Sequence, residues 1–224
     1  MKQFKDTFFF SVVSELDDEY KSILDIFTKS IKSSKIRLKH NIINTGSHSG
    51  VWQSKDYLNN VFKKLYITYD KLSSGIPVIC SDIDIIFYRD FYDFLHTESK
   101  KFDVIFSIDH QFFCTGFFYV KPTPLTTHLF NPNITIKPWS GDQGDQGYIN
   151  NKLIDLEHNY KDLKVGYICP SIAPYGKYIY DKLGIINNPI LAHFNWTVGA
   201  REKLEKMNLY NSKELIEYDG AHII

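Results

Sequence analysis

The feature that most constrains this chain is a regular alternation of apolar runs and amphipathic segments in its first part. The run at 7–14 is almost continuously apolar, which is typical of a buried strand. A helical stripe follows at 20–31, a second strand-like segment at 36–47, a second stripe at 58–72, and a third apolar run from Gly75 onward. Such alternation predicts an α/β fold in which helices cover the faces of a mostly parallel sheet.

The second half is less regular but still carries recognisable elements. Strands are expected at 102–109 and 116–122 around a loop at Asp109–Thr115, a helix at 145–154, late strands at 163–170 and 189–196, and a closing helix at 198–207. No stretch is rich enough in Gly, Ser or Pro to divide the chain. We therefore expect residues 1–224 to form a single domain.

The composition excludes several classes of protein. Hydrophobic residues make up 43% of the chain and the formal net charge is +0, which argues against disorder and against nucleic-acid binding by phosphate neutralisation. Three widely spaced cysteines give neither a disulfide framework nor a zinc pattern. The longest early apolar run is too short to span a bilayer. We expect a soluble cytoplasmic protein, in the host cytoplasm if the chain is viral.

Two carboxylates stand inside the apolar segment "GIPVICSDIDIIFYRD". Asp82 and Asp84 follow a strand-like run and are themselves followed by Ile85, Ile86 and Phe87. Buried charge is costly unless it is compensated, and ligands of open α/β sheets bind beyond the carboxyl ends of strands. A divalent cation such as Mg²⁺ or Mn²⁺ would compensate both groups. Alone, this pattern is explained equally well by a turn in which the Asp side chains cap backbone N–H groups.

A second polar cluster follows a late apolar strand in "AHFNWTVGAREK". His193 could complete a site made by two carboxylates, and Gly199 would let backbone N–H groups at a helix start approach a phosphate. Arg201 and Lys203 lie on that helix. The common alternatives are a hydrogen-bonded core histidine and an ordinary solvated helix face.

Two further segments combine small and polar residues. "GDQGDQG" holds Asp142, Gln143, Asp145 and Gln146 among glycines that permit close approach of a ligand, although a surface turn would look the same. "SIDHQFFCTGFFYV" places Asp109 at the end of a strand, where a hairpin-like connection is the alternative.

In this order, four segments resemble the nucleotide-diphospho-sugar transferase family, which are GT-A-fold glycosyltransferases of the family 77 type, related in layout to family 8. The segments are "SDIDIIFYRD", "CTGFFYVKPTP", "GDQGYINN" and "HFNWTVGAREK". The resemblance spans about residues 8–207. It implies a Rossmann-like GT-A fold, with a nucleotide-binding half at about 1–90 and an acceptor and catalytic half at about 91–224. The chain is short for such an enzyme, so it is either minimal or one domain of a longer polypeptide.

The resemblance also implies a role for each matching position. Asp82, Asp84 and His193 would hold Mn²⁺ or Mg²⁺, with Asp82 also near the ribose. Gly199 and Lys203 would grip the donor diphosphate, Lys64 (with Lys63 adjacent) would reach the donor, and Ser11 and Val12 would meet the base. Asp109, Asp145 and Gln146 would lie near the reacting sugar, with Asp142 and Gln143 as rivals from the repeated GDQ. One departure is Cys114, which stands where the family commonly has Asn.

The implied activity is transfer of a sugar from a nucleotide-diphosphate sugar, expected to be a UDP-sugar, to a hydroxyl of a glycan or glycoprotein. The resemblance favours retention of anomeric configuration. No motif carboxylate is an obvious nucleophile, so a front-face attack and a covalent intermediate both stay open. Two other functions compete. One is a non-catalytic nucleotide-sugar-binding module, and the other is a haloacid-dehalogenase-like phosphohydrolase, whose Asp-x-Asp pair follows the first strand of its fold.

Overall fold

A computed structural model describes residues 4–14, 17–46, 55–134, 144–154, 160–197 and 199–211 of the 224. A short 3₁₀ helix at Phe4–Asp6 precedes the first strand. The strands are β1 (Phe8–Val13), β2 (His40–Asn44), β3 (Val78–Ser81), β4 (Ile85–Phe87), β5 (Val104–Asp109), β6 (Phe112–Val120), β7 (Val165–Tyr167) and β8 (Leu191–His193). The helices are α1 (Asp18–Ser33), α2 (Lys55–Ser73), α3 (Tyr92–Glu98), α4 (Pro124–Phe130), α5 (Asp145–Ile154), α6 (Gly176–Tyr180) and α7 (Ala200–Asn211).

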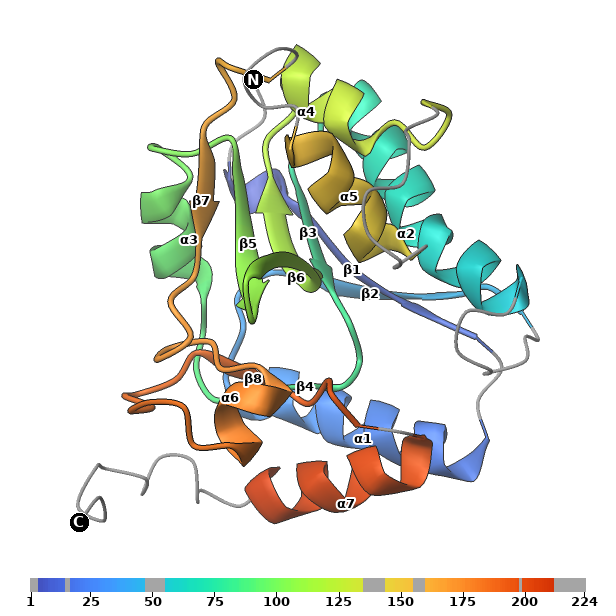
Figure 1. Cartoon of the computed structure of the whole chain (residues 1–224), viewed down its shortest axis with the longest axis vertical. Helices are drawn as coiled ribbons and strands as arrows, with labels where there is room; N and C mark the ends of the chain where they lie inside the picture. The colour runs from blue at the N-terminus through green and yellow to red at the C-terminus, as the bar shows by residue number, and fades with distance from the viewer. Residues whose placement is uncertain are drawn as a thin grey trace.

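Six strands form the central sheet in the order β2-β1-β3-β6-β5-β7 (Figure 1). Strand β1 runs parallel to β2 and β3, and β5 runs parallel to β7. Strand β6 is antiparallel to both of its neighbours, β3 and β5. The predicted α/β fold with a mostly parallel sheet is therefore confirmed, and the second half is less regular because β6 reverses direction inside the sheet.

Both faces of the central strands β1 and β3 are largely buried, which explains why these two strands are almost continuously apolar. Successive side chains of β1 point to opposite faces: Phe10 packs into a core beneath α2, α4 and α5, and Phe9 packs into a core shared with α1 and α3. Both phenylalanines are fully buried. Figure 1 shows α2, α4 and α5 together on one side of the sheet and α3 on the other.

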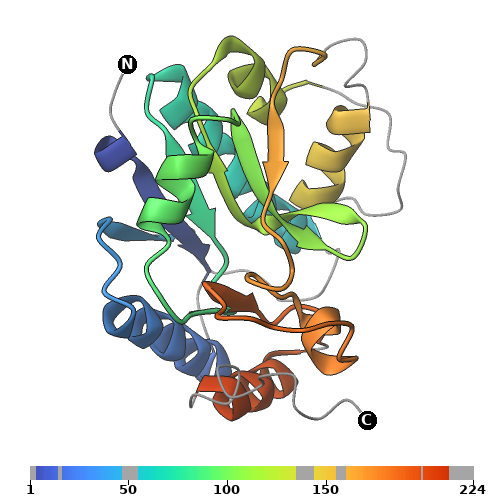
Figure 2. The ribbon, with the colours of Figure 1, turned by 90° about the vertical axis from the view of Figure 1, so that its left-hand side faces the viewer.

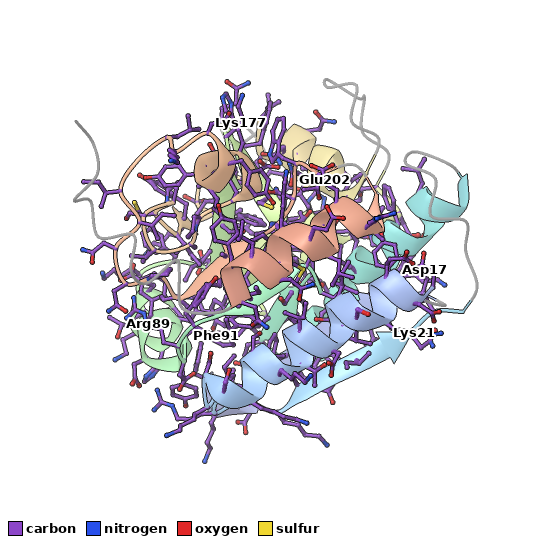
Figure 3. The ribbon with its side chains drawn as sticks, turned by 90° about the horizontal axis from the view of Figure 1, so that it is seen from below. Asp17, Lys21, Arg89, Phe91, Lys177 and Glu202 are labelled. Carbon is purple, nitrogen blue, oxygen red and sulfur yellow. The ribbon has the colours of Figure 1, made fainter. Side chains whose placement is uncertain are left out.

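A smaller sheet closes one end of the molecule. Strands β4 and β8 pair antiparallel, and in Figures 1 and 2 they lie between the central sheet and the helices α1 and α7. A third core joins these parts through Ile26 of α1, Ile86 of β4, Phe194 after β8 and Met207 of α7. Seen from below, α1 and α7 lie side by side (Figure 3). This end piece holds β4 and β8 against the carboxyl ends of the parallel strands.

One sequence prediction is confirmed and another needs correction. Asp82 and Asp84 follow the end of a strand, because β3 ends at Ser81 and the chain turns at Asp82–Asp84 before it enters β4 in the second sheet. The predicted loop at Asp109–Thr115 is mostly strand. Asp109 pairs with Phe112, so only two residues form the turn, and His110 adopts a left-handed conformation with φ +57.

Candidate active site

Strand pairing brings two distant motifs to one edge of the sheet. After β3, the Asp82 N–H donates to the Gly116 carbonyl of β6 at 2.7 Å. In the small sheet, Ile85 of β4 lies opposite His193 of β8, and the Phe194 N–H donates to the Asp84 carbonyl at 2.8 Å. The register of a short antiparallel pair thus fixes His193 beside the Asp-x-Asp turn.

Asp82, Asp84 and His193 form a group whose ligand atoms all lie within 4.8 Å of one another. His193 Nε2 is 3.2 Å from Asp84 Oδ1 and 3.9 Å from Asp82 Oδ2. Asp84 and His193 are buried, and the Asp82 side chain is 34% exposed. Two carboxylates and an imidazole are ligands that Mn²⁺ and related divalent ions accept, so the donor set fits a metal ion.

A small residue and a thiol position the imidazole. A Cβ atom on Gly116 would lie 2.2 Å from His193 Cε1, so this position accepts only glycine while the ring stays in place. On the other ring nitrogen, Cys114 Sγ lies 3.6 Å from His193 Nδ1. A partner on Nδ1 fixes the orientation of the ring and leaves Nε2 facing the carboxylates.

Two lysines compensate the carboxylates from opposite sides. Lys64 of α2 is buried, and its Nζ lies 2.9 Å from Asp82 Oδ1 and 2.7 Å from Asp145 Oδ2. Lys203 of α7 places its Nζ 2.5 Å from Asp84 Oδ2. With His193 neutral, these three carboxylates and two lysines carry one net negative charge. A divalent cation would reverse that charge, and the site would then attract an anionic diphosphate.

These contacts set the protonation of the cluster. Burial opposes charge on Asp84, but Lys203 and His193 together hold the pKa of Asp84 well below its usual range. Burial raises the pKa of Asp82 against the opposing effect of Lys64. Burial alone would lower the pKa of Lys64, yet Asp145 and Asp82 hold that pKa well above its usual value. Likewise, Asp84 raises the pKa of His193 despite burial, so a proton and a metal ion compete for Nε2.

A second polar contact set lies around the end of β5. Asp109 Oδ2 accepts a hydrogen bond from Gln146 Nε2 at 3.3 Å, and Oδ1 accepts from Trp196 Nε1 at 2.5 Å. Helix α5, which carries Gln146, is fixed to β6 because the amide of Asn150 exchanges hydrogen bonds with the backbone of Phe113. The structure therefore brings Asp109 and Gln146 together, as the sequence suggested, while Asp145 turns toward Lys64.

The other predicted residues are placed as follows. Ser11 is fully buried, with its hydroxyl 3.0 Å from His40 Nε2, and Val12 is half-buried beside the α2 core. Of the two adjacent lysines, Lys64 reaches Asp82, whereas Lys63 donates to the Thr45 carbonyl. Gly199 has φ +84 and immediately precedes α7, and Arg201 on that helix pairs with Glu205. The rival pair Asp142 and Gln143 lies outside the described residues.

The sequence analysis predicted no contact for three residues of this neighbourhood: Cys114, which it named only as a departure from the family pattern, Gly116 and Trp196. Their contacts join β6 to β8 and β5 to the segment after β8, across about eighty residues of chain. The available signal was their position inside the conspicuous segments "CTGFF" and "HFNW". A single sequence does not show which side chain each of these residues faces.

A family profile described as nucleotide-diphospho-sugar transferase matches residues 25–207. A solved glycosyltransferase involved in glycosylation of the major capsid of PBCV-1 is 10% identical with a TM-score of 0.56, and the match covers 90% of this chain and 99% of that one. Mouse xyloside xylosyltransferase 1 is 11% identical with a TM-score of 0.55, covering 87% of this chain and 100% of that one.

Glycosyltransferase GlyE of Streptococcus pneumoniae TIGR4 is 11% identical with a TM-score of 0.51, and the match covers 95% of this chain but only 62% of that one. No curated protein sequence matches the chain. At such low identity the solved structures establish the fold, which is of the GT-A type. The family profile covers most of the chain, and the chain therefore belongs to the nucleotide-diphospho-sugar transferase family of glycosyltransferases.

Proposed function

We propose that the chain transfers a sugar from a nucleotide-diphosphate sugar, expected to be a UDP-sugar, to a hydroxyl of a glycan or glycoprotein in a metal-dependent reaction. The observation that carries this proposal is the convergence of Asp82, Asp84 and His193 at the sheet edge, with Lys64 and Lys203 against the carboxylates. Ligands of open α/β sheets bind at this edge.

Mn²⁺ or Mg²⁺ is the proposed metal, and it would neutralise charge that develops on the leaving diphosphate. Asp82, Asp84 and His193 would hold it. Lys203 lies on α7 one turn after Gly199, whose left-handed backbone (φ +84) opens the helix. We assign the diphosphate to Lys203 and to the backbone N–H groups at this helix start, because both favour anions.

Lys64 would orient Asp82 toward metal and ribose, and Asp145 would keep Lys64 in place through their 2.7 Å ion pair. The base is proposed to lie at the end of β1, where the backbone of Ser11 and Val12 is the contact. The Ser11 side chain is directed at His40 and is fully buried, so it offers no free hydroxyl there.

Asp109 and Gln146 are proposed to lie near the reacting carbon. In the reaction, the bond from the anomeric carbon to the diphosphate oxygen breaks and a bond to the acceptor oxygen forms, while the acceptor proton passes to the departing diphosphate. Both oxygens of Asp109 already accept hydrogen bonds, from Gln146 and Trp196. That arrangement supports an orienting role for Asp109 and favours front-face attack with retention over a covalent intermediate.

Turnover of labelled UDP-sugars in Mn²⁺, in Mg²⁺ and in EDTA tests the proposal. We expect metal-dependent release of UDP that is slow without an acceptor and faster with one. Asp84→Asn should abolish UDP release under both conditions. The matched control is Asp90→Asn, because Asp90 pairs with Arg37 on another part of the surface. Full turnover in EDTA would refute the metal assignment, and metal-dependent UDP binding without any turnover would favour a binding module.

The phosphohydrolase alternative loses support, because Asp82 follows β3, the third strand of the chain, and not the first. For the compartment, Cys80, Cys114 and Cys169 are free thiols, which supports our proposal of a reducing cytoplasmic environment. Among the described helices, none is long and apolar enough to cross a bilayer.

A further inference from the structure

Trp196 is an exposed aromatic residue in a strained backbone conformation. Its side chain lies three residues after His193, is 55% exposed, and sits on a backbone with φ +61. A left-handed conformation is costly for a bulky residue and persists only when the surroundings fix it. Two costs therefore accompany this position of the indole: part of an apolar ring stays exposed to water, and the backbone keeps an unfavourable conformation.

Hydrogen bonds fix Trp196 at the N–H edge of its indole ring and at the backbone just before it. The indole N–H donates to Asp109 Oδ1 at 2.5 Å, and Asp109 Oδ2 accepts from Gln146. The preceding residue is also fixed, because Asn195 Oδ1 accepts from the Gly176 N–H at 2.7 Å. A Cβ on Gly176 would lie 1.9 Å from the Asn195 carbonyl oxygen, so α6 approaches this backbone as closely as glycine allows.

The result is an indole whose N–H edge donates to Asp109 of the candidate active site, while the residue as a whole remains 55% exposed. If Trp196 had only a structural role in the segment after β8, its ring could pack into the neighbouring core, which already holds Phe194. A hydrogen-bond donor lies over the ring, because Lys177 Nζ of α6 is 5.4 Å from the ring centroid in a cation–π position. Lys177 lies at the outer margin of the view in Figure 3.

An exposed aromatic face with polar groups at its edge has the chemistry that binds a sugar ring. The C–H face of a pyranose packs on the negative face of an aromatic ring, while its hydroxyls bond to groups at the rim. Here the ammonium of Lys177 lies over the ring, and the carboxylate of Asp109 lies at the rim, beyond the indole N–H. The indole N–H donates to Asp109, and Asp109 also accepts from Gln146. These two residues are the ones proposed to lie near the reacting carbon.

We propose that Trp196 is the stacking platform for a pyranose ring of the acceptor, so that the acceptor is a glycan or glycoside and not an unglycosylated peptide. This inference rests on the proposed sugar transfer and specifies its acceptor. It concerns binding alone and adds no chemical step.

Saturation-transfer NMR with a panel of methyl pyranosides (gluco, galacto, manno and xylo) tests the platform, with UDP and Mn²⁺ present. Trp196→Phe keeps an aromatic face and loses the N–H, whereas Trp196→Ala loses both. Tyr66→Ala is the matched control, because Tyr66 is an aromatic side chain of α2 that is 51% exposed. Thermal unfolding of each variant shows that it is folded.

We expect at least one glycoside to bind the wild-type protein, within about threefold as tightly to Trp196→Phe, and roughly tenfold more weakly to Trp196→Ala. Equal loss in the Phe and Ala variants would assign the effect to the indole N–H and overturn the platform. Binding of no pyranoside, or binding unaffected by Trp196→Ala, would overturn it as well. UDP binding is recorded in the same samples, and its dependence on Mn²⁺ decides the proposed function separately.

Discussion

Replacing Lys64 by methionine should reveal how the site charges contribute to stability. The Lys64 side chain is 7% exposed and pairs with Asp82 at 2.9 Å and with Asp145 at 2.7 Å. Removing one partner of a buried ion pair typically costs about 3–5 kcal/mol, because the other charge stays buried without compensation. Asp145 is 9% exposed but Asp82 is 34% exposed, so water can partly solvate Asp82.

We therefore expect Lys64→Met to lower the free energy of unfolding by about 3 kcal/mol, near the lower end of that range. For a domain of this size, that corresponds to a fall in Tm of roughly 6–12 °C. Lys63→Met is the matched control. Lys63 is the neighbouring lysine of the same helix, and its Nζ donates to the Thr45 carbonyl just after β2, in a partly buried hydrogen bond. Loss of this hydrogen bond in Lys63→Met should lower the free energy of unfolding by about 1 kcal/mol or less.

The dependence on pH identifies the cause. Burial raises the pKa of Asp82 and Lys64 is the main opposing influence, so the pKa of Asp82 should rise further in Lys64→Met. A carboxyl whose pKa is higher in the folded state contributes stability at low pH and loses it as pH rises through the folded pKa. The deficit of the variant should thus be largest near neutrality and shrink on acidification, and Lys64→Met/Asp145→Asn should recover part of it.

Urea unfolding monitored by circular dichroism, at neutral pH and at mildly acidic pH, measures these differences. A deficit below about 1 kcal/mol would show that Lys64 is not the buried counter-ion that the structure describes. A deficit that stays the same on acidification would show that loss of packing, and not uncompensated carboxylate charge, destabilises the variant.

Three further predictions concern single positions. Gly116→Ala should displace the His193 ring, because the new Cβ would lie 2.2 Å from His193 Cε1. The protein should stay folded, and Mn²⁺ binding measured by electron paramagnetic resonance titration should weaken about tenfold or more. Unchanged Mn²⁺ affinity would contradict the close packing of Gly116 on His193. Lys152→Met should cost about 2 kcal/mol in urea unfolding, because the buried ammonium donates to three carbonyls around the end of α4, and a cost near zero would contradict this role. Burial lowers the pKa of His40 to about 4, so stability should fall between about pH 6.5 and 4 by up to roughly 3 kcal/mol, and His40→Gln should flatten that slope.

Much of the fold could be predicted because local patterns determined it. The apolar run 7–14 and the stripe at 58–72 correspond to β1 and α2, and the helix expected at 145–154 is α5. The errors arose where pairing partners decide the structure. Strand β4 was not predicted, because it pairs with β8, more than one hundred residues later in the chain, and no local feature records that partner.

The candidate site shows the same division. Asp82, Asp84 and His193 could be named from residue type and order, and they do converge. The choice of Lys64 over Lys63 depends on which face of α2 meets the sheet, and Lys64 lies next to the fully buried Leu65. Trp196 could not be assigned, because its function depends on a left-handed backbone and on a hydrogen bond to Asp109 from another strand.

The most direct test of the account is calorimetric titration of UDP into the protein with and without Mn²⁺, for the wild type and for Asp84→Asn. The account predicts that UDP binds the wild type much more tightly when Mn²⁺ is present, by about tenfold or more, and that Asp84→Asn removes this difference. Circular dichroism should show that the variant is still folded, at a lower Tm because Lys203 and His193 lose their buried partner. Equal UDP affinity with and without Mn²⁺ in the wild type, or an unchanged Mn²⁺ effect in Asp84→Asn, would contradict a metal site at Asp82, Asp84 and His193.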